Sequence, residues 1–415
     1  MRLILFYLIF LPTILLATTL EVGKNKTFPT IKSALAQASQ GDIIRVHPGL
    51  YREGTLVIEK SVTLSGVGRP VLDGELKGEI IQVYGDNVTI EGFKFINSGQ
   101  DEIQSVAAVH LYQSSGTTIR QNIFENNYYA IYLQASNAST VEHNKITTTR
   151  GKSQEMIGDG IHVLGSWDIQ VKNNYISGHK DGIYLEKNKR CYIYKNLSRG
   201  NLRYGLHFMF SNDSTYSGNV FDNNGAGVAV MYAMNVHMIK NRFINNYGDG
   251  TYGLLLKEIS YSKIEGNFFE NNTTGVYADG ATKIDFYNNH FNTNGWGMKI
   301  NANCMENRVK RNNFIGNTFD VSTNGTVVLN EFSENYWDQY EGYDLNKDGE
   351  GDVPFHPLSL YAVLVEQNPS VMLLFRTIFV DILNRTEKII PSLTPESFVD
   401  NKPLIKPVEV SLETK

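Results

Sequence analysis

The chain has 415 residues, a formal net charge of −5 and hydrophobic residues at 41% of its positions. This length is long for a single globular core, although it is ordinary for a protein built from stacked repeats. No basic stripe accompanies the slightly acidic charge, and nucleic acid is therefore excluded as an expected partner.

Residues 1–17 have the pattern of a secretory signal peptide. A charged start at Met1-Arg2 is followed by an apolar stretch that ends near Ala17. The stretch is shorter than a transmembrane helix needs and contains Pro12, so an uncleaved membrane anchor is kept only as the alternative. We expect the chain to be exported.

Residues 18–44 are expected to cap the N-terminal end of the repeats. Apolar residues between Phe28 and Ala38 have helical spacing, and Thr30 is a candidate N-cap. Gly41-Asp42 ends this predicted helix. A helix placed over the end of a solenoid blocks its open sheet edge from pairing with other chains.

Residues 45–340 carry a repeat of about 22 residues, in which Asn, any residue and then Phe, Ile or Leu are followed by Gly and alternating apolar residues; only Asn196 departs from it, with Ser198 at the third position. The Asn falls at Asn122, Asn144, Asn174, Asn196, Asn219, Asn241, Asn267, Asn289, Asn312 and Asn330. The alternation, as in Val228 and Val230, is typical of strands with one buried face. Stacked Asn side chains can bond from coil to coil. We therefore predict an all-β fold, a right-handed parallel β-helix of about a dozen coils, roughly 55–60 Å long.

The two cysteines, Cys191 and Cys304, lie in different repeats. Five repeats separate them, which places them on the order of 24 Å apart along the axis. A disulfide needs Cα atoms within about 7 Å. We therefore expect two buried free thiols.

A candidate Cu(I) site follows from counting positions after the repeat Gly. Residues one and three positions after it should point inward, and those two and four positions after it outward. By this count His207 and Met209 share an outer face, and Met231 lies beside Met209 on the next coil. Thioether sulfur suits Cu(I), and imidazole suits copper generally. The alternative is that the methionines only pack under an outer loop.

An enzyme that cleaves polysaccharide is a second hypothesis, because it would need two carboxylates in one cleft. Asp159 and Asp181 each precede the repeat Gly and should stack on adjacent coils about 5 Å apart. The alternative is that they only shape turns. A third hypothesis is a scaffold that binds a protein partner through a tyrosine-rich outer face.

Residues 341–356 form an acidic loop with the sequence DLNKDGEGD from Asp344 to Asp352. Its first positions, Asp344, Asn346 and Asp348, resemble those of a calcium loop, and Asp352 adds another carboxylate. The position where an EF-hand closes with a bidentate Glu is occupied by Phe355. The loop has two alternative interpretations, a calcium site and an Asx turn that binds no ion.

Residues 357–415 should form an amphipathic helix followed by an extended tail. The helix is predicted over residues 371–390, with too many charges to span a bilayer. Its apolar side chains are Phe375, Ile378, Phe379, Ile382 and Leu383. They could fold back on the rod or bind a membrane partner.

Several segments resemble the NosD family of accessory proteins for nitrous oxide reductase. The segments are SGHKDGIYL (177–185), RYGLHFMFSND (203–213), NGAGVAVMY (224–232), YGLLLKEI (252–259), NYWDQYEGYDLNKDGEGDVP (335–354) and FRTIFVDILNRTEKIIPSLTPE (375–396). The similarity extends from GDIIRVHPGLYRE to the tail and covers nearly all of the mature chain.

This resemblance implies a non-enzymatic role in maturing the copper–sulfide centre of nitrous oxide reductase. It implies periplasmic work beside the inner membrane with an ABC-type ATPase and permease, a copper chaperone and the reductase as client. The C-terminal helix would then be a candidate contact with the permease. The family provides no catalytic residues and no copper ligands to carry over, so His207, Met209 and Met231 rest on the position count alone.

Overall fold

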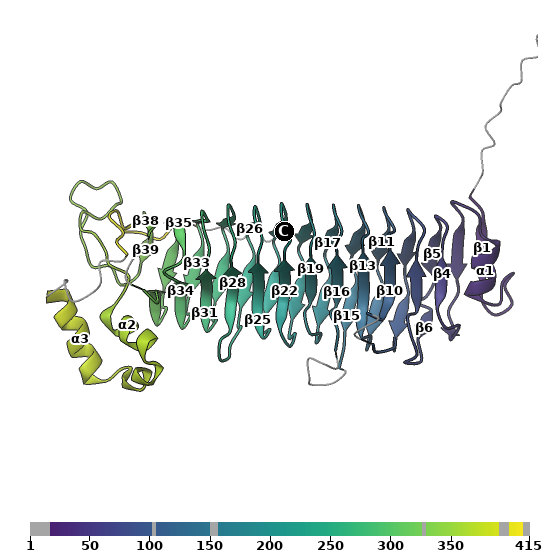
Figure 1. Ribbon diagram of the computed structural model, residues 1–415, viewed down its shortest axis with the longest axis horizontal. Coiled ribbons are helices and arrows are strands. Elements are labelled where there is room, and N and C mark those ends of the chain that lie inside the picture. Colours follow the sequence, from purple (N-terminus) through teal and green to yellow (C-terminus); the bar gives the residue numbers. More distant parts are fainter. Residues whose placement is uncertain (1–16, 102–104, 150–156, 326–328, 390–397, 410–415) are drawn as a thin grey trace, which may run out of the picture.

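The computed structural model describes residues 17–101, 105–149, 157–325, 329–389 and 398–409. They form one long rod of stacked coils, with a helix at the N-terminal end and a small helical cluster at the other (Figure 1). Each regular coil contributes one strand to each of three parallel sheets. The predicted parallel β-helix is confirmed. Most of the predicted signal peptide, residues 1–16, lies outside the described residues.

The three sheets have 14, 13 and 12 strands, in the order in which a coil visits them. The first sheet comprises β1 Thr19–Val22, β2 Ile43–Val46, β5 Thr63–Gly66, β8 Thr89–Glu91, β11 Thr118–Arg120, β14 Thr140–Glu142, β17 Gln170–Lys172, β20 Tyr192–Tyr194, β23 Thr215–Ser217, β26 His237–Ile239, β29 Lys263–Glu265, β32 Asp285–Tyr287, β35 Met305–Lys310 and β38 Leu329–Ser333.

The second sheet comprises β3 Leu50–Tyr51, β6 Val71–Asp73, β9 Lys94–Ile96, β12 Ile123–Glu125, β15 Lys145–Thr147, β18 Tyr175–Ser177, β21 Leu197–Arg199, β24 Val220–Asp222, β27 Arg242–Ile244, β30 Phe268–Glu270, β33 His290–Asn292, β36 Asn313–Ile315 and β39 Tyr336–Trp337. The third sheet comprises β4 Leu56–Ile58, β7 Ile81–Val83, β10 Ala107–Tyr112, β13 Tyr129–Gln134, β16 Ile161–Leu164, β19 Ile183–Glu186, β22 Tyr204–Met209, β25 Ala226–Met231, β28 Tyr252–Lys257, β31 Thr274–Asp279, β34 Trp296–Ile300 and β37 Phe319–Ser322.

The asparagine ladder runs along the corner between the first and second sheets. Each Asn Oδ1 accepts from the backbone N–H and from Nδ2 of the preceding Asn, as Asn241 does from Asn219, at 3.0 Å each. Nδ2 of Asn219 also donates to the carbonyl of Ile193 on the preceding coil. One prediction is wrong here, because Asn312 donates to Asn335 and not to Asn330. Asn330 instead accepts from Asn307 on a different column.

Two further features fill the interior. A second asparagine ladder, represented by Asn224 donating to Asn246, follows the corner between the second and third sheets. A stack of rings on the second sheet has centroids 4.3–5.5 Å apart. Its members are Phe221, Phe243, Phe269, Phe291, Phe314 and Trp337.

The repeat Gly is required because the next coil is close: a Cβ on Gly205 would lie 2.7 Å from the carbonyl oxygen of Gly227.

The N-terminal cap contains α1 Ile31–Gln37, which contacts β1, β2 and β4. The predicted N-cap is confirmed, since Thr30 accepts from the backbone N–H of Ser33 at 3.1 Å. The sheet starts earlier than residue 45, however. β1 lies within the segment 18–44 and pairs with β2, so the cap already contains a strand of the first sheet.

The C-terminal segment contains three short helical elements. α2 Leu360–Gln367, which the sequence analysis did not predict, packs against β37. The single helix predicted over 371–390 is divided into the 3₁₀-helix η2 Pro369–Leu374 and α3 Ile378–Ile389. The chain turns between them at Arg376, whose φ of 63° is left-handed and ends a right-handed helix. No helix within the described ranges is long and apolar enough to cross a membrane.

The C-terminal tail caps the asparagine ladder. The sequence analysis predicted an extended tail but not this cap. The Asp400 carboxylate, fully buried, accepts from the backbone N–H and Nδ2 of Asn335 at 2.9 and 3.0 Å. It also accepts from the indole N–H of Trp337 and the backbone N–H of Glu334. Asp400 therefore takes the place of the next ladder asparagine.

The ladder predicts a large cost for removing one step. Asn219→Ala leaves the N–H groups of Asn196 and the carbonyl of Ile193 buried without partners, so the free energy of unfolding should fall by about 2–4 kcal/mol. Urea denaturation measures this change. The matched control is Asn223→Gly at an exposed turn residue with φ 51°, where glycine fits and stability should hold. Equal stability of both variants would show that the ladder contributes little.

The cap predicts a comparable effect at the far end of the rod. Asp400→Ala removes the acceptor of five buried or half-buried N–H groups, and we expect a loss of at least about 3 kcal/mol. Hydrogen exchange should locate the loss at β38 and β39. Lys402→Ala, which removes only an exposed ion pair with Glu350, is the control. Exchange at β38 and β39 that matches the unsubstituted chain contradicts the capping role.

Candidate functional site

Histidine and tyrosine alternate along the outer face of the third sheet, over five successive coils. The register pairs each residue with its neighbour on the next coil, from β10 through β13, β16 and β19 to β22. Neighbouring ring centroids are 4.5–4.6 Å apart. We call this set the His–Tyr column; its members are His110, Tyr132, His162, Tyr184 and His207.

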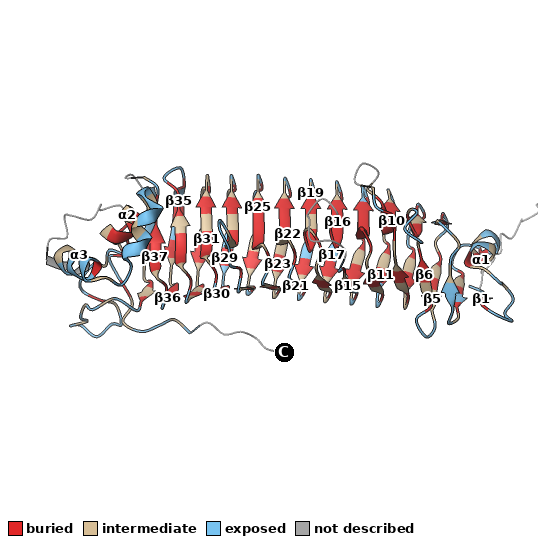
Figure 2. Ribbon diagram, turned by 90° about the horizontal axis from the view of Figure 1, so that it is seen from below, coloured by how far each residue is buried: buried red, intermediate tan, exposed pale blue. Residues whose placement is uncertain are grey.

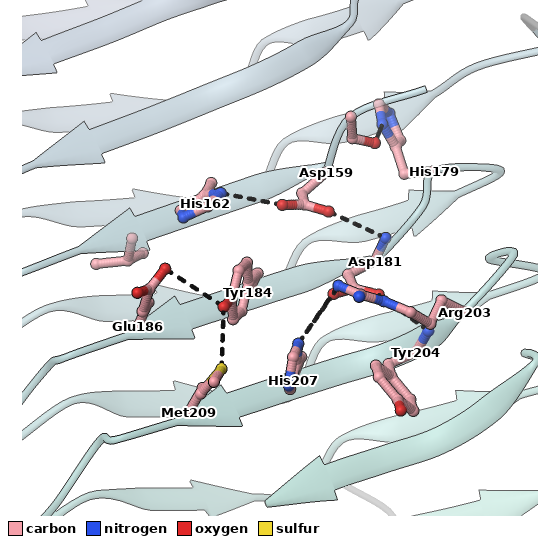
Figure 3. Close-up of polar contacts among 12 residues, drawn as sticks. Asp159, His162, His179, Asp181, Tyr184, Glu186, Arg203, Tyr204, His207 and Met209 are labelled. Carbon is pink, nitrogen blue, oxygen red and sulfur yellow. Dashed lines mark hydrogen bonds and ion pairs between the residues drawn. The ribbon is translucent and has the colours of Figure 1, made fainter. Parts of the chain in front are cut away.

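Each histidine of the column is anchored through Nδ1 by a carboxylate. Nδ1 of His162 lies 3.0 Å from Asp159 Oδ2, and Nδ1 of His207 lies 3.2 Å from Asp181 Oδ2 (Figure 3). Glu79 pairs with Nδ1 of His110 in the same way. A carboxylate that holds one ring nitrogen fixes the orientation and tautomer of the other, as around metal-binding histidines.

Asp181 is the most constrained of these carboxylates. It accepts from Arg203 Nε at 2.8 Å, from the other Arg203 nitrogen, from the N–H of Tyr204 and from His207. Burial of Asp181 acts to raise its pKa, but the hydrogen bonds and positive charges of Arg203 and His207 outweigh burial, and the pKa is lowered. Asp181 is therefore ionised at neutral pH and anchors both Arg203 and His207.

The predicted stacking of Asp159 and Asp181 on adjacent coils is present. The backbone N–H of Asp181 donates to Asp159 Oδ1 at 3.2 Å. Both side chains are buried, at 3% and 0% exposure, and both are held by neighbouring groups. A glycosidase needs one carboxyl free to give a proton and room beside it for a sugar. The arrangement instead positions the histidine rings.

The three predicted copper ligands lie on one face, but their surroundings differ from the expectation of an open surface. Met209 and Met231 are register partners and half-buried, whereas His207 is enclosed at 5% exposure. The Tyr184 hydroxyl lies 3.4 Å from Met209 Sδ and 3.3 Å from Glu186 Oε2. Since Asp181 occupies Nδ1 of His207, only its Nε2 is available to a metal.

No group of three or more His, Cys, Asp or Glu side chains gathers to hold a metal ion anywhere in the described part of the chain. The thiols add no ligand. Both are free and buried as predicted, and burial raises the pKa to about 12 for Cys191 and about 11 for Cys304. Metal ligation requires the thiolate.

The acidic loop has the hydrogen bonds of Asx turns. Asp344 accepts from the N–H groups of Lys347 and Gly349, and Asn346 accepts from Asp348. Asp352 accepts from Leu345 across the loop. These contacts support the turn interpretation of Asp344, Asn346, Asp348 and Asp352 and give calcium no support.

The predicted partner-binding residues divide into two groups. Leu383 is partly buried and packs against the hydrophobic core. Phe375, Ile378, Phe379 and Ile382 are exposed, Ile378 to 77%. They continue an exposed run of apolar residues at 372–374. In Figure 2 exposed residues gather at this end of the rod, in η2 and α3, whereas α2 is mostly buried or intermediate.

Sequence reasoning named Asp159 and Asp181 but did not predict that they anchor histidines, and it missed Glu79, His110 and Tyr132. Glu79 is 31 residues from His110, and neither falls in the segment where the repeat Gly is regular. A signal for the column was present in the sequence. His162 and His207 each stand two positions after the repeat Gly, on coils separated by one coil.

Comparisons with known proteins agree with this architecture. Residues 147–342 match the family described as periplasmic copper-binding protein (NosD), and residues 31–159 match the right-handed beta helix region. A PL6 alginate lyase in complex with a trisaccharide has a TM-score of 0.57 at 14% identity, covering 77% of this chain and 85% of that chain. A likeness at this identity shows the shared fold alone.

Two relatives carry the name probable ABC transporter binding protein NosD. The one from Pseudomonas aeruginosa is 27% identical over 371 residues, covering 85% of this chain and 86% of that protein. The one from Stutzerimonas stutzeri is 26% identical over 395 residues, covering 89% and 88%. The family match and these relatives confirm the resemblance to the NosD family seen in the sequence.

Proposed function

We propose that this chain is a non-enzymatic periplasmic accessory protein that helps to build the copper–sulfide centre of nitrous oxide reductase. It works with an ABC-type ATPase and permease at the inner membrane, receives Cu(I) from a copper chaperone and presents it to the reductase. The observation that carries this proposal is the NosD match together with relatives named for ABC transporter binding.

The C-terminal end of the rod is the surface that binds the permease. η2 and α3 expose apolar side chains at the end of the rod, next to α2, which holds the cluster on β37. Exposed contiguous apolar surface of this kind marks an interaction site. The contact surface expected on the permease is therefore apolar as well.

Copper contacts the outer face of β22 and β25. Sulfur from Met209 and Met231 suits Cu(I), and Nε2 of His207 adds one neutral nitrogen from the same face. Tyr184 holds Met209 from the side through its hydroxyl. This arrangement has few ligands and is half-buried, which suits transient transfer rather than permanent storage.

Removing these ligands should weaken copper binding without unfolding the rod. We expect the combined variant His207→Ala, Met209→Ala and Met231→Ala to lower Cu(I) affinity at least about tenfold, measured against a chromophoric competitor under anaerobic conditions. The far-UV CD spectrum should be unchanged. Met305→Ala, at an exposed methionine on the first sheet, is the control. Unaltered affinity of the combined variant removes these residues from the copper site.

The binding of the permease is tested by charge substitutions rather than by truncation. Deleting residues 371–415 would also remove Asp400 and uncap the ladder, so a loss of binding could arise from misfolding. Phe379→Glu with Ile382→Glu places charges on exposed positions and should abolish co-purification with the permease at unchanged thermal stability. Tyr247→Glu, 60% exposed on the rod, is the control. Retained co-purification contradicts the assignment.

A further inference from the structure

The exposed apolar surface at the C-terminal end of the rod is larger than one face of a helix. Its side chains lie on η2, on α3 and at the turn between them, where Arg376 has a φ of 63°. A helix bound in a groove places its apolar residues along one stripe, so a permease contact on α3 does not account for those on η2. The exposed residues are Met372, Leu373, Leu374, Phe375, Ile378, Phe379 and Ile382.

The first five of these residues form a projecting surface, which we call the apolar tip (Met372, Leu373, Leu374, Phe375 and Ile378). Leu373 is 88% exposed and Ile378 is 77% exposed, so the rest of the described chain covers little of either side chain. α3 lies beyond the last coils, and α2 lies between it and the strands of the rod (Figure 1 and Figure 2). A fluid bilayer closes around projecting apolar side chains, whereas a protein partner would need a matching cavity for each.

The helical cluster that carries the tip is fixed to the rod. Glu366 on α2 accepts from Lys299 Nζ at 2.8 Å and from Ser322 Oγ at 3.3 Å, both from strands of the third sheet. The ring of Phe319 on β37 also contacts the ring of Tyr361, with centroids 5.7 Å apart. A surface held in place before binding has little ordering cost when it binds. Insertion of the tip therefore also fixes the direction of the rod relative to the bilayer.

The charges around the tip are complementary to an anionic lipid surface. Residues 372–388 contain three basic and two acidic residues, whereas the whole chain has a net charge of −5. Arg376 and Arg385 are exposed, and Asp381 is exposed between them. The Arg376 guanidinium lies over the Phe375 ring, 5.4 Å from its centroid. Arginine keeps its charge among lipid headgroups while its stem lies on apolar surface, and anionic headgroups attract it. The acidic remainder of the rod is directed away from the bilayer.

We propose that the apolar tip inserts directly into the surface of an anionic phospholipid bilayer. The insertion depth is roughly 5–10 Å, as for other interfacial segments. α3 has 12 residues and is about 18 Å long, so it lies in the interface and does not cross the bilayer. This contact goes beyond the proposed function, because the lipid holds the rod at the membrane even where no permease is present. Phe379 and Ile382 remain for the permease.

The test uses the mature chain from residue 18 onward, so that the predicted apolar leader does not contribute. Flotation is measured with protein-free vesicles of phosphatidylcholine that contain about one quarter phosphatidylglycerol. Leu373→Gln with Ile378→Gln removes side chains that the rest of the chain barely covers, so folding should be unchanged. The vesicle partition coefficient should fall at least about 30-fold.

The matched control places the same substitutions at exposed leucines outside the tip. Leu76→Gln with Leu345→Gln, at residues 60% and 77% exposed, should float as the unsubstituted chain does. Arg376→Gln with Arg385→Gln should weaken binding to the anionic vesicles about tenfold and leave binding to pure phosphatidylcholine unchanged. Circular dichroism verifies that all variants are folded.

Insertion depth distinguishes a bilayer contact from adsorption at the surface. Ile378→Trp should add fluorescence that brominated lipids quench, whereas Leu345→Trp should add fluorescence that they do not quench. An unsubstituted chain that does not float, or a tip variant that floats equally well, overturns the inference. If the chain binds no vesicles but still co-purifies with the permease, this inference fails and the permease contact stands. If it binds vesicles and no permease is recovered, the inference stands and the permease contact fails.

Discussion

The coil-to-coil hydrogen bond of the asparagine ladder is the constraint on which the rest of the structure depends. Each ladder Asn Oδ1 binds two N–H groups of the preceding coil, and its Nδ2 returns a bond to a backbone carbonyl, as Asn219 and Asn241 show. The polar groups of a buried corner are thereby satisfied by one residue type. Because every coil repeats the bond, every coil keeps the same register with its neighbours.

Fixed register converts sequence periodicity into columns of side chains. Inside the rod the columns become an aromatic stack and a glycine row, and outside they become the His–Tyr column. The outer column needs this regularity, since an imidazole between two tyrosines stays in contact with both only if strand spacing does not vary. The carboxylates of Asp159 and Asp181 stand where the coil enters β16 and β19, so they reach the histidines from the corner. The β-helix thus positions the histidine side chains and their carboxylate partners on its outer face, without a cleft.

Much of this could be predicted from the sequence, because a repeat is visible wherever one residue type is obligatory. The ladder, the alternating strands, the cap at Thr30 and the shared face of Met209 and Met231 all followed from local spacing. The errors occurred where the structure replaced the expected residue. Asn335 was passed over because Trp337 stands where an aliphatic or Phe residue was required, although Trp337 continues the ring stack. Asp400 could not be found, since it is 65 residues from Asn335 and is not an asparagine.

The site was less predictable than the fold, since burial on an outer face depends on neighbours that spacing does not reveal. Counting positions placed His207 outside, but its ring lies between Tyr184 and Tyr204 and is enclosed. The central claim is that the chain acts as a membrane-associated copper accessory protein. Its most direct test is purification of a tagged chain from membranes without crosslinker, followed by mass spectrometry. Recovery of an ABC-type ATPase and permease is the predicted result; a chain recovered alone that cleaves polysaccharide would contradict the account.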